Sequence, residues 1–232
     1  LRSLMKALGD WNLKSPSKES FTGYELSNDE IFNKEHNDLL VMARNSSRAL
    51  LHSLDLDERR ESARLIAMLR DSHPISSTRI LNFITKDSVP EEDFHFLACL
   101  ARLSSSLDQG SAKKISESIL CLDSKIQGKQ VRSKQTYIDR LNEVIVGLAE
   151  RGPIFEHLCQ STLLARPNHV GIAGAFPEPF RSRAAEVFFL AALKDPKNGW
   201  GADLINLISK IFEFLKFLIE KNIIKKETQS PK

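Results

Sequence analysis

The chain has 232 residues, which is enough for one large domain or for an elongated array of repeats. Its 41% hydrophobic and 27% charged residues are ordinary for a globular protein, and a net charge of +3 is too small to indicate nucleic-acid binding from bulk charge alone. Ten glycines, two tyrosines and little β-branched alternation argue against a sheet protein. No stretch is long and apolar enough for a membrane span, and none has the pattern of a secretory signal.

Residues 1–26 are predicted to form a loosely packed N-terminal arm. The stretch from Gly9 to Leu26 is rich in Ser, Lys, Pro and Gly, which favours a linker over a helix. Its only large side chains are Trp11, Phe21 and Tyr24. We expect these three side chains to anchor the arm to a helical body.

A helical-repeat domain is predicted from 27 to 224. Its first helix is expected from Ser27 to about Leu54, and Ser27 with Glu30 has the spacing of a capping box. Asp55 and Glu58 repeat that spacing before the next helix.

The stretch from Asp55 to Leu107 reads as three helices, each with one apolar stripe. Steps of three and four place on these stripes Leu65, Met68 and Leu69, then Ile80, Leu81 and Ile84, then Phe94, Phe96, Leu97, Ala98, Leu100, Ala101, Leu103 and Leu107. Asp71-Ser-His-Pro74 is expected to end the first helix, and Ser88-Val-Pro-Glu91 predicts a capping box with a first-turn proline for the third. None of these helices buries its stripe alone, so each needs neighbours, as in stacked helical hairpins.

Shorter helices are predicted further along the chain. Gly110 is expected to close the long helix and Ser111 to open the next one. An amphipathic helix from about Tyr137 stops at Gly152-Pro153, and a short helix follows it through Cys159. After an irregular stretch from Arg166 to Pro179, a helix from Arg181 to Leu193 is expected to turn inward Ala184, Ala185, Phe188, Phe189 and Ala192.

The last predicted helix, 202–224, carries an unusually wide apolar face, and a polar tail follows at 225–232. A helix that ends an array normally shows a polar outer face, because nothing packs beyond it. We therefore predict an interface for a protein partner, a second copy or the remainder of a longer chain at Phe212, Phe214, Phe217 and Leu218. The alternative is that the N-terminal arm folds back and covers this strip.

Residues able to carry chemistry are sparse. His95 and Cys99 share a helix face, but structural zinc needs four ligands and no sequence-local partners occur. Cys99, Cys121 and Cys159 are odd in number and widely spaced, so we expect unpaired thiols that hold no metal. We assign no catalytic, cofactor-binding or metal-binding residue and identify no small-molecule substrate. The sequence favours a protein that is not an enzyme.

Two further patterns have an ordinary explanation. A basic loop that could face an anion or a partner carries Lys125, Lys129, Arg132 and Lys134, but it has no interleaved aromatic residue and is better explained as a solvated loop. Gly171 to Gly174 resembles a fragment of a phosphate loop, yet it follows no predicted strand and lacks the full spacing.

Several short strings resemble a known family when they are taken together. They are Asp71-Ser-His-Pro74, Glu92-Asp-Phe-His-Phe-Leu97 with Leu100-Ala-Arg-Leu103, Leu122-Asp-Ser-Lys-Ile126, Arg140-Leu141 with Leu148-Ala-Glu-Arg-Gly-Pro153, Arg166-Pro-Asn-His169, Phe176-Pro177, Arg183-Ala-Ala185 and Asp195-Pro196 with Trp200. The set resembles the HEAT-like helical region of large exported bacterial haem-binding dehydrogenase-like proteins. The resemblance implies an exported helical part alone, because the chain has no Cys-x-x-Cys-His for attaching a haem and no propeller-like strand series.

The sequence thus predicts an all-α fold, an irregular stack of antiparallel helix pairs such as a HEAT-like α-solenoid or α-α superhelix. The favoured function is a non-enzymatic scaffold or protein-interaction module, because the extended face of such an array suits binding. One alternative is a helical accessory region of an exported haem-binding dehydrogenase-like protein. Another is a nucleic-acid-binding helical repeat protein, which the charge balance disfavours. Without the resemblance, a cytoplasmic location is expected.

Overall fold

The computed structural model describes residues 18–26, 37–127 and 133–209 of the chain. All regular secondary structure in these ranges is helical and none of it is strand, which confirms the predicted all-α class. The chain divides into two compact units, Leu1–Leu158 and Cys159–Lys232, and each is described by itself. No helix in the described ranges has the length and apolarity needed to cross a lipid bilayer.

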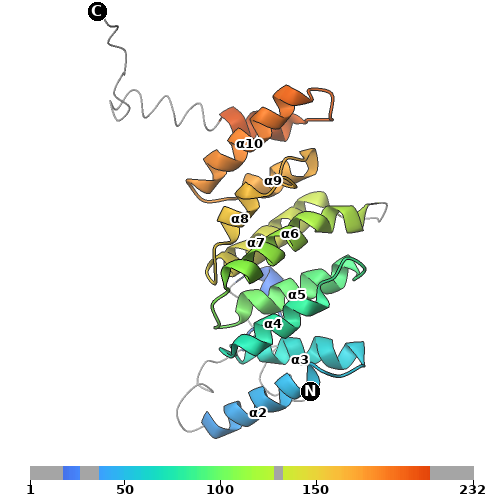
Figure 1. Cartoon of the computed structure of the whole chain (residues 1–232), viewed down its shortest axis with the longest axis vertical. Coiled ribbons are helices and arrows are strands. Elements are labelled where there is room, and N and C mark those ends of the chain that lie inside the picture. Colours follow the sequence, from blue (N-terminus) through green and yellow to red (C-terminus); the bar gives the residue numbers. More distant parts are fainter. Residues whose placement is uncertain (1–17, 27–36, 128–132, 210–232) are drawn as a thin grey trace, which may run out of the picture. The chain divides into compact units, whose positions relative to one another are not determined.

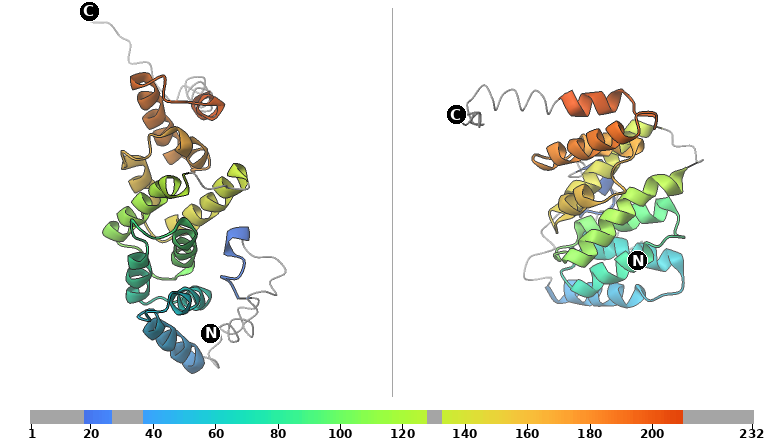
Figure 2. Two further views of the ribbon diagram at one scale, coloured as in Figure 1. Left: turned by 90° about the vertical axis from the view of Figure 1, so that its right-hand side faces the viewer. Right: turned by 45° about the horizontal axis from the view of Figure 1, so that its top comes forward.

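The first unit is a double layer of helices (Figure 1). After the 3-10 helix η1 (Glu19–Phe21) come α2 (Asn37–Leu50), α3 (Leu56–Met68), α4 (Pro74–Phe83), α5 (Pro90–Arg102), α6 (Gln109–Ile126), α7 (Lys134–Ala149) and the start of α8 (Ile154–Gln160). Helices α3, α5 and α7 pack one against the next, while α4 and α6 pack beside each other against α5. In the left view of Figure 2, α3, α5 and α7 face the segment 18–26, and α4 and α6 lie on the other side.

Polar side chains cap the N-termini of α3, α4, α6 and α7. Asp55 caps α3 by accepting from the backbone N–H groups of Asp57 and Glu58, as predicted, although the Glu58 carboxylate turns to the Ser53 hydroxyl instead of closing a reciprocal box. Helix α4 begins at Pro74 in the first turn, where the preceding His73 accepts from the N–H of Ile75. Each cap satisfies a backbone donor that has no partner inside the helix.

Two predicted helix boundaries are wrong. Val89, not Ser88, stands at the N-cap of α5, because the Ser88 hydroxyl donates instead to the Asp93 carboxylate and to the Thr85 carbonyl. Gly110 does not close the long helix, since α5 already ends at Arg102. Gly110 lies in the first turn of α6, which Asp108 caps by accepting from the backbone N–H of Ser111.

The apolar stripes of α3, α4 and α5 form the core of the first unit. Every predicted stripe residue is buried except Phe94, which is half-buried. The loop after α5 stays inside as well, because Leu103 and Leu107 are buried and the Leu107 N–H donates to the Arg151 carbonyl over 2.8 Å. The helical period therefore identifies the core of this unit correctly, although it overestimates the length of α5.

The second unit contains η4 (Pro167–His169), α9 (Val170–Ala173), α10 (Phe180–Lys194) and a helical stretch at 202–209. Ala184, Ala185 and Phe188 of α10 are buried as predicted, and the Phe188 ring meets the Trp200 indole edge-on. Phe189 does not face inward: it is 41% exposed. Because Phe189 follows Phe188 by about 100° around the helix, both cannot belong to one narrow buried face.

Candidate functional site

The segment 18–26, called the arm segment below, lies across α3, α5 and α7 of the first unit (Figure 2). It begins with η1, and a hydrogen bond from the Tyr24 N–H to the Phe21 carbonyl then forms one further turn. Its last residue, Leu26, is buried in an apolar cluster with Leu40, Leu65, Met68 and Leu69. Its two aromatic side chains, Phe21 and Tyr24, are the predicted anchors, and Trp11 of the predicted arm lies outside the described residues.

Helix α5 holds the arm segment through Arg102. The Arg102 guanidinium stacks over the Phe21 ring at 5.2 Å and also pairs with the Glu25 carboxylate at 3.0 Å. Phe21 is only 3% exposed, because Gly147 of α7 leaves room for its ring: a Cβ at that position would stand 3.1 Å from both the Phe21 ring and the Ala101 side chain. One arginine therefore recognises an aromatic ring and a carboxylate together.

Arg102 is partly buried among charged groups of both signs. Burial lowers the pKa of Arg102, the Glu25 carboxylate opposes that shift, and the charges of Arg70 and Arg151 add to it. Glu25 is itself buried, at 8% exposure. A buried carboxylate needs a charged partner, and here the Arg102 guanidinium supplies it at 3.0 Å.

Helix α3 and His95 of α5 hold the next part of the arm segment. The Tyr24 hydroxyl lies 2.7 Å from His95 Nδ1, and His95 Nε2 lies 3.1 Å from the carbonyl oxygen of Arg60. Since a carbonyl only accepts, Nε2 carries the proton and Nδ1 accepts from the tyrosine. Arg64 donates to the Gly23 carbonyl over 2.6 Å, and its guanidinium lies 5.6 Å from the centre of the Tyr24 ring.

Helix α7 holds the start of the arm segment. The Ser20 N–H donates to the Glu143 carboxylate and the Ser20 hydroxyl donates to the Arg140 carbonyl, both over 2.9 Å. The Arg140 guanidinium pairs with the carboxylates of Glu19 and Glu143. Although partial burial opposes the shift, hydrogen bonds from Ser20 and Arg140 lower the pKa of Glu143. This carboxylate therefore stays ionised and keeps its hydrogen bonds.

Each of the three helices thus contributes one arginine to the arm segment: Arg64 from α3, Arg102 from α5 and Arg140 from α7. We call the surfaces of α3, α5 and α7 that contact residues 18–26 the arm-binding face. Sequence reasoning identified Phe21 and Tyr24 as anchors but none of these arginines. The three arginines lie too far apart in the sequence to form a short motif. They are brought together only because α3, α5 and α7 pack side by side.

His95 and Cys99 do come together, with Nε2 and Sγ 3.7 Å apart, but the pair is unsuited to nucleophilic catalysis. Cys99 is fully buried, and burial raises the pKa of its thiol. Burial also lowers the pKa of His95 to about 4, and both ring nitrogens already face other partners. The thiol is therefore neutral, and both nitrogens of the imidazole are already hydrogen-bonded. The pair is suited to holding Tyr24 of the arm segment and not to attacking a substrate.

Metal and disulfide chemistry find little support in the described ranges. No group of three or more His, Cys, Asp or Glu side chains there could hold a metal ion. No disulfide joins Cys99, Cys121 and Cys159, all of which lie within those ranges.

Lys125 does not belong to a loop that faces a partner. It lies in the last turn of α6, where its ammonium pairs with the buried carboxylate of Asp93 and donates to the Thr85 carbonyl and the Ser88 hydroxyl. Lys134 begins α7 and is exposed. Lys129 and Arg132 lie outside the described residues, and so do the predicted interface residues Phe212, Phe214, Phe217 and Leu218.

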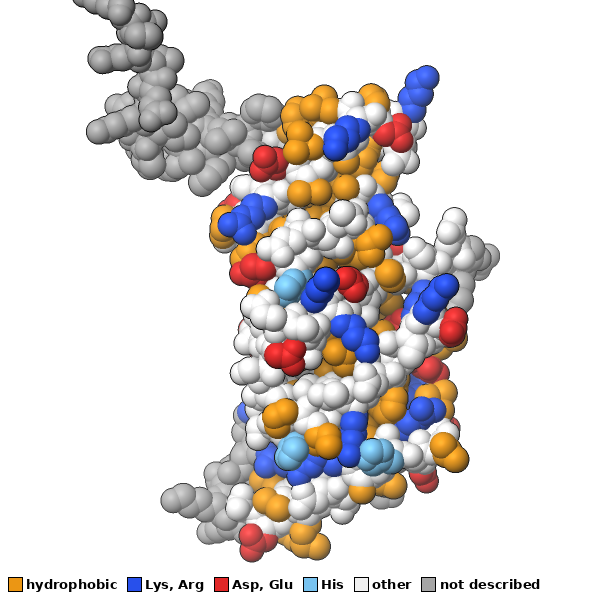
Figure 3. Space-filling view, viewed as in Figure 1, with side chains coloured by type: hydrophobic (Ala, Val, Ile, Leu, Met, Phe, Trp, Pro, Cys, Tyr) orange, Lys and Arg blue, Asp and Glu red, His pale blue; other side chains and the backbone are white. Residues whose placement is uncertain are grey.

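Basic side chains are mostly interspersed with acidic and apolar ones on the face shown in Figure 3, and some gather over the region of α2 to α4. Arginines of these helices are used for packing. Arg48 pairs with buried Asp71 at 2.6 Å, Arg44 donates to the Leu69 carbonyl and Arg79 donates to the Arg48 carbonyl. Because these guanidinium groups already pair with groups of the chain itself, they stabilise the contacts between helices and are poorly placed to bind the phosphates of a nucleic acid.

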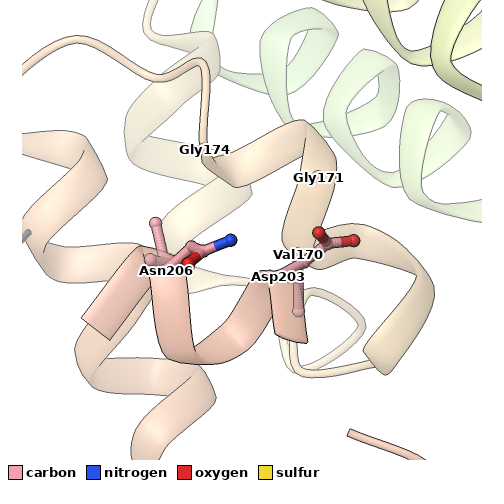
Figure 4. Close-up of a pocket in the computed structure, with 6 residues that line it drawn as sticks. Val170, Gly171, Gly174, Asp203 and Asn206 are labelled. Atoms are coloured by element: carbon pink, nitrogen blue, oxygen red, sulfur yellow. The ribbon is translucent and has the colours of Figure 1, made fainter. Parts of the chain in front are cut away.

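A small pocket of about 150 Å³ lies in the second unit, between α9 and the helical stretch 202–209 (Figure 4). It is lined by Val170, Gly171, Gly174, Asp203, Asn206 and Leu207. The Asp203 carboxylate would repel a phosphate at this place, and the glycines follow a 3-10 helix instead of a strand. This geometry supports the dismissal of a phosphate loop at Gly171 to Gly174.

No protein-family model, no curated protein and no solved structure matches the chain. The resemblance to the helical region of haem-binding dehydrogenase-like proteins therefore stays a prediction from short sequence strings.

Proposed function

We propose that the chain is a non-enzymatic, HEAT-like helical-repeat module that binds a short polypeptide segment through the arm-binding face. The observation that carries the proposal is the arm segment itself, a short stretch of polypeptide lying across three neighbouring helices, α3, α5 and α7. Arrays of stacked helix pairs commonly present such an extended surface to a partner. The alternation of α3, α5 and α7 with α4 and α6 supports the array architecture.

The contacts of the arm segment are of the kind that recognise a peptide. They include hydrogen bonds to its backbone at Ser20 and Gly23, a seat for an aromatic ring at Phe21 and a buried charge pair at Glu25. Aromatic and arginine side chains carry much of the energy of protein interfaces. The same surface offers no activated nucleophile, which favours binding over catalysis.

Peptide binding in trans tests this proposal. A fluorescent peptide with the sequence of residues 18–26 is titrated with the full chain and with its Phe21→Ala/Tyr24→Ala variant, and anisotropy reports binding. We expect saturable binding to the variant and at least tenfold weaker binding to the unaltered chain, because the tethered arm competes at high effective concentration. A variant that keeps its helical circular dichroism but binds no peptide would contradict the proposal.

A further inference from the structure

The arm segment does not occupy its face uniformly: some of its positions are recognised closely and others are exposed. Ser20, Phe21, Glu25 and Leu26 are buried, whereas Thr22 is exposed. Because only Thr22 is exposed among residues 20–26, we infer that the face distinguishes side chains by their position along the segment.

Glycine is required at one position. Gly23 has φ +80°, which side chains other than glycine rarely adopt. A Cβ at this residue would also stand 2.1 Å from the terminal nitrogen of Arg64, the residue that donates to the Gly23 carbonyl. The backbone turn therefore disfavours a larger residue here, and a Cβ would also require the Arg64 side chain to move.

The two residues after the glycine meet complementary groups. The Tyr24 hydroxyl donates to His95, and the Glu25 carboxylate pairs with Arg102. Upstream, Phe21 stacks under the same Arg102, and the carboxylate of Glu19 pairs with Arg140. Negative charge on the segment thus faces positive charge on α5 and α7 at both of its acidic positions.

We infer that the arm-binding face recognises a linear motif of the form acidic–Ser–Phe–x–Gly–Tyr–acidic, supplied in trans by a partner polypeptide and mimicked by residues 19–25 of this chain. The inference rests on the proposed function, of which it names the ligand class. The tethered copy then acts as a built-in competitor that a partner must displace. Glu19 is 70% exposed and forms a surface pair, so displacement can begin at η1, where the contacts cost least to break.

A peptide panel tests the motif on the full-length Phe21→Ala/Tyr24→Ala variant. The parent peptide, residues 18–26, is compared with versions carrying Gly23→Ala, Glu25→Gln or Thr22→Ser, and with a scrambled sequence. We expect Gly23→Ala and Glu25→Gln each to weaken binding at least tenfold. Thr22→Ser is the matched control, because it keeps the hydroxyl that donates to the Glu19 carbonyl at an exposed position, and it should change affinity less than twofold.

The outcomes distinguish failure of the motif from failure of the proposed peptide-binding function. Equal binding of all peptides, the scrambled one included, would leave the proposed function standing and overturn the motif. No binding of any peptide to a folded variant would overturn both.

If the double variant does not fold, hydrogen exchange on the otherwise unaltered chain decides instead. Glu25→Gln should speed amide exchange in residues 18–26 at least tenfold, while Thr22→Ser should leave it unchanged. Equal protection in both variants would overturn the motif.

Discussion

At the residue scale, Gly23 combines two constraints that can be separated. Gly199 also has a positive φ, +67°, but a Cβ there would meet nothing within 4 Å. Alanine at Gly199 should therefore cost only left-handed strain, about 1 kcal/mol, whereas alanine at Gly23 adds the collision with Arg64.

We predict that Gly23→Ala accelerates hydrogen exchange in residues 18–26 at least tenfold and that Gly199→Ala does not alter it. Mass spectrometry of peptic fragments measures both variants under the same conditions. Unchanged protection of the arm segment in Gly23→Ala would show that Arg64 can move aside without releasing it.

His95 provides a pH-dependent test at the same scale. Burial lowers its pKa to about 4, the hydrogen bond to the Arg60 carbonyl opposes this shift, and the charges of Arg60 and Arg64 add to it. Between pH 6.5 and pH 4, His95 is therefore mostly protonated in the unfolded chain and mostly neutral in the folded chain. His95 contributes stability that is fully present above pH 6.5 and is lost as the pH falls toward 4.

We predict that the free energy of unfolding of the unaltered chain falls by up to about 3 kcal/mol more between pH 7 and pH 4 than that of a His95→Gln variant. Urea denaturation at a series of pH values measures this difference. Parallel pH profiles for the two proteins would mean that the imidazole is solvated in the folded chain.

At the element scale, α5 is the central helix of the first unit, with α3, α4, α6 and α7 all packed against it. Leu97 lies in the middle of α5 and is fully buried. We predict that Leu97→Asp costs more than about 3 kcal/mol, because it buries a charge without a partner. The control is Val146→Asp on α7, where the side chain is 42% exposed and little change is expected. Thermal unfolding followed by circular dichroism compares them, and equal melting temperatures would contradict the central role of α5.

The buried pair of Asp93 and Lys125 joins α5 to the end of α6, and the two side chains are 1% and 15% exposed. We predict that Asp93→Asn and Lys125→Met each destabilise the chain by about 3 kcal/mol, since each leaves the other partner without its counter-charge. The double variant should cost clearly less than the sum, and urea denaturation of all four proteins gives the coupling energy. Additive losses would mean that the two groups do not stabilise each other.

The same helices show which features can be predicted from the sequence and which cannot. The stripes that carry Leu65, Ile80 and Leu97 were predictable, because helical periodicity is local and the core follows it. The roles of Lys125 and Arg102 were not, since their partners Asp93 and Glu25 lie far away in the chain and are brought near only by helix packing. A pattern of single residues does not encode which charges meet across layers.

At the scale of the whole chain, 33 basic residues against 30 acidic ones give little net charge, yet the sequence-distant arginines of three helices converge on one short segment. Bulk composition conceals such local complementarity, because the net charge does not show that Glu19 faces Arg140 and Glu25 faces Arg102. Because of these contacts, release of the arm segment should change the solvent exposure of residues beneath it on α5. Cys99 offers a natural probe, since it is fully buried beside His95, the partner of Tyr24.

We predict that iodoacetamide modifies Cys99 of the native chain far more slowly than the half-buried Cys159 of the second unit, because only transient opening exposes the Cys99 thiol. In a Phe21→Ala variant, where the arm segment loses its main anchor, alkylation of Cys99 should accelerate at least tenfold while Cys159, the reference within the same molecule, keeps its rate. Tryptic peptide mass spectrometry at timed intervals measures both. Unchanged labelling of Cys99 in this variant would show that the thiol is shielded by α5 and its neighbouring helices alone, and that the arm segment leaves without loosening the surface it covers.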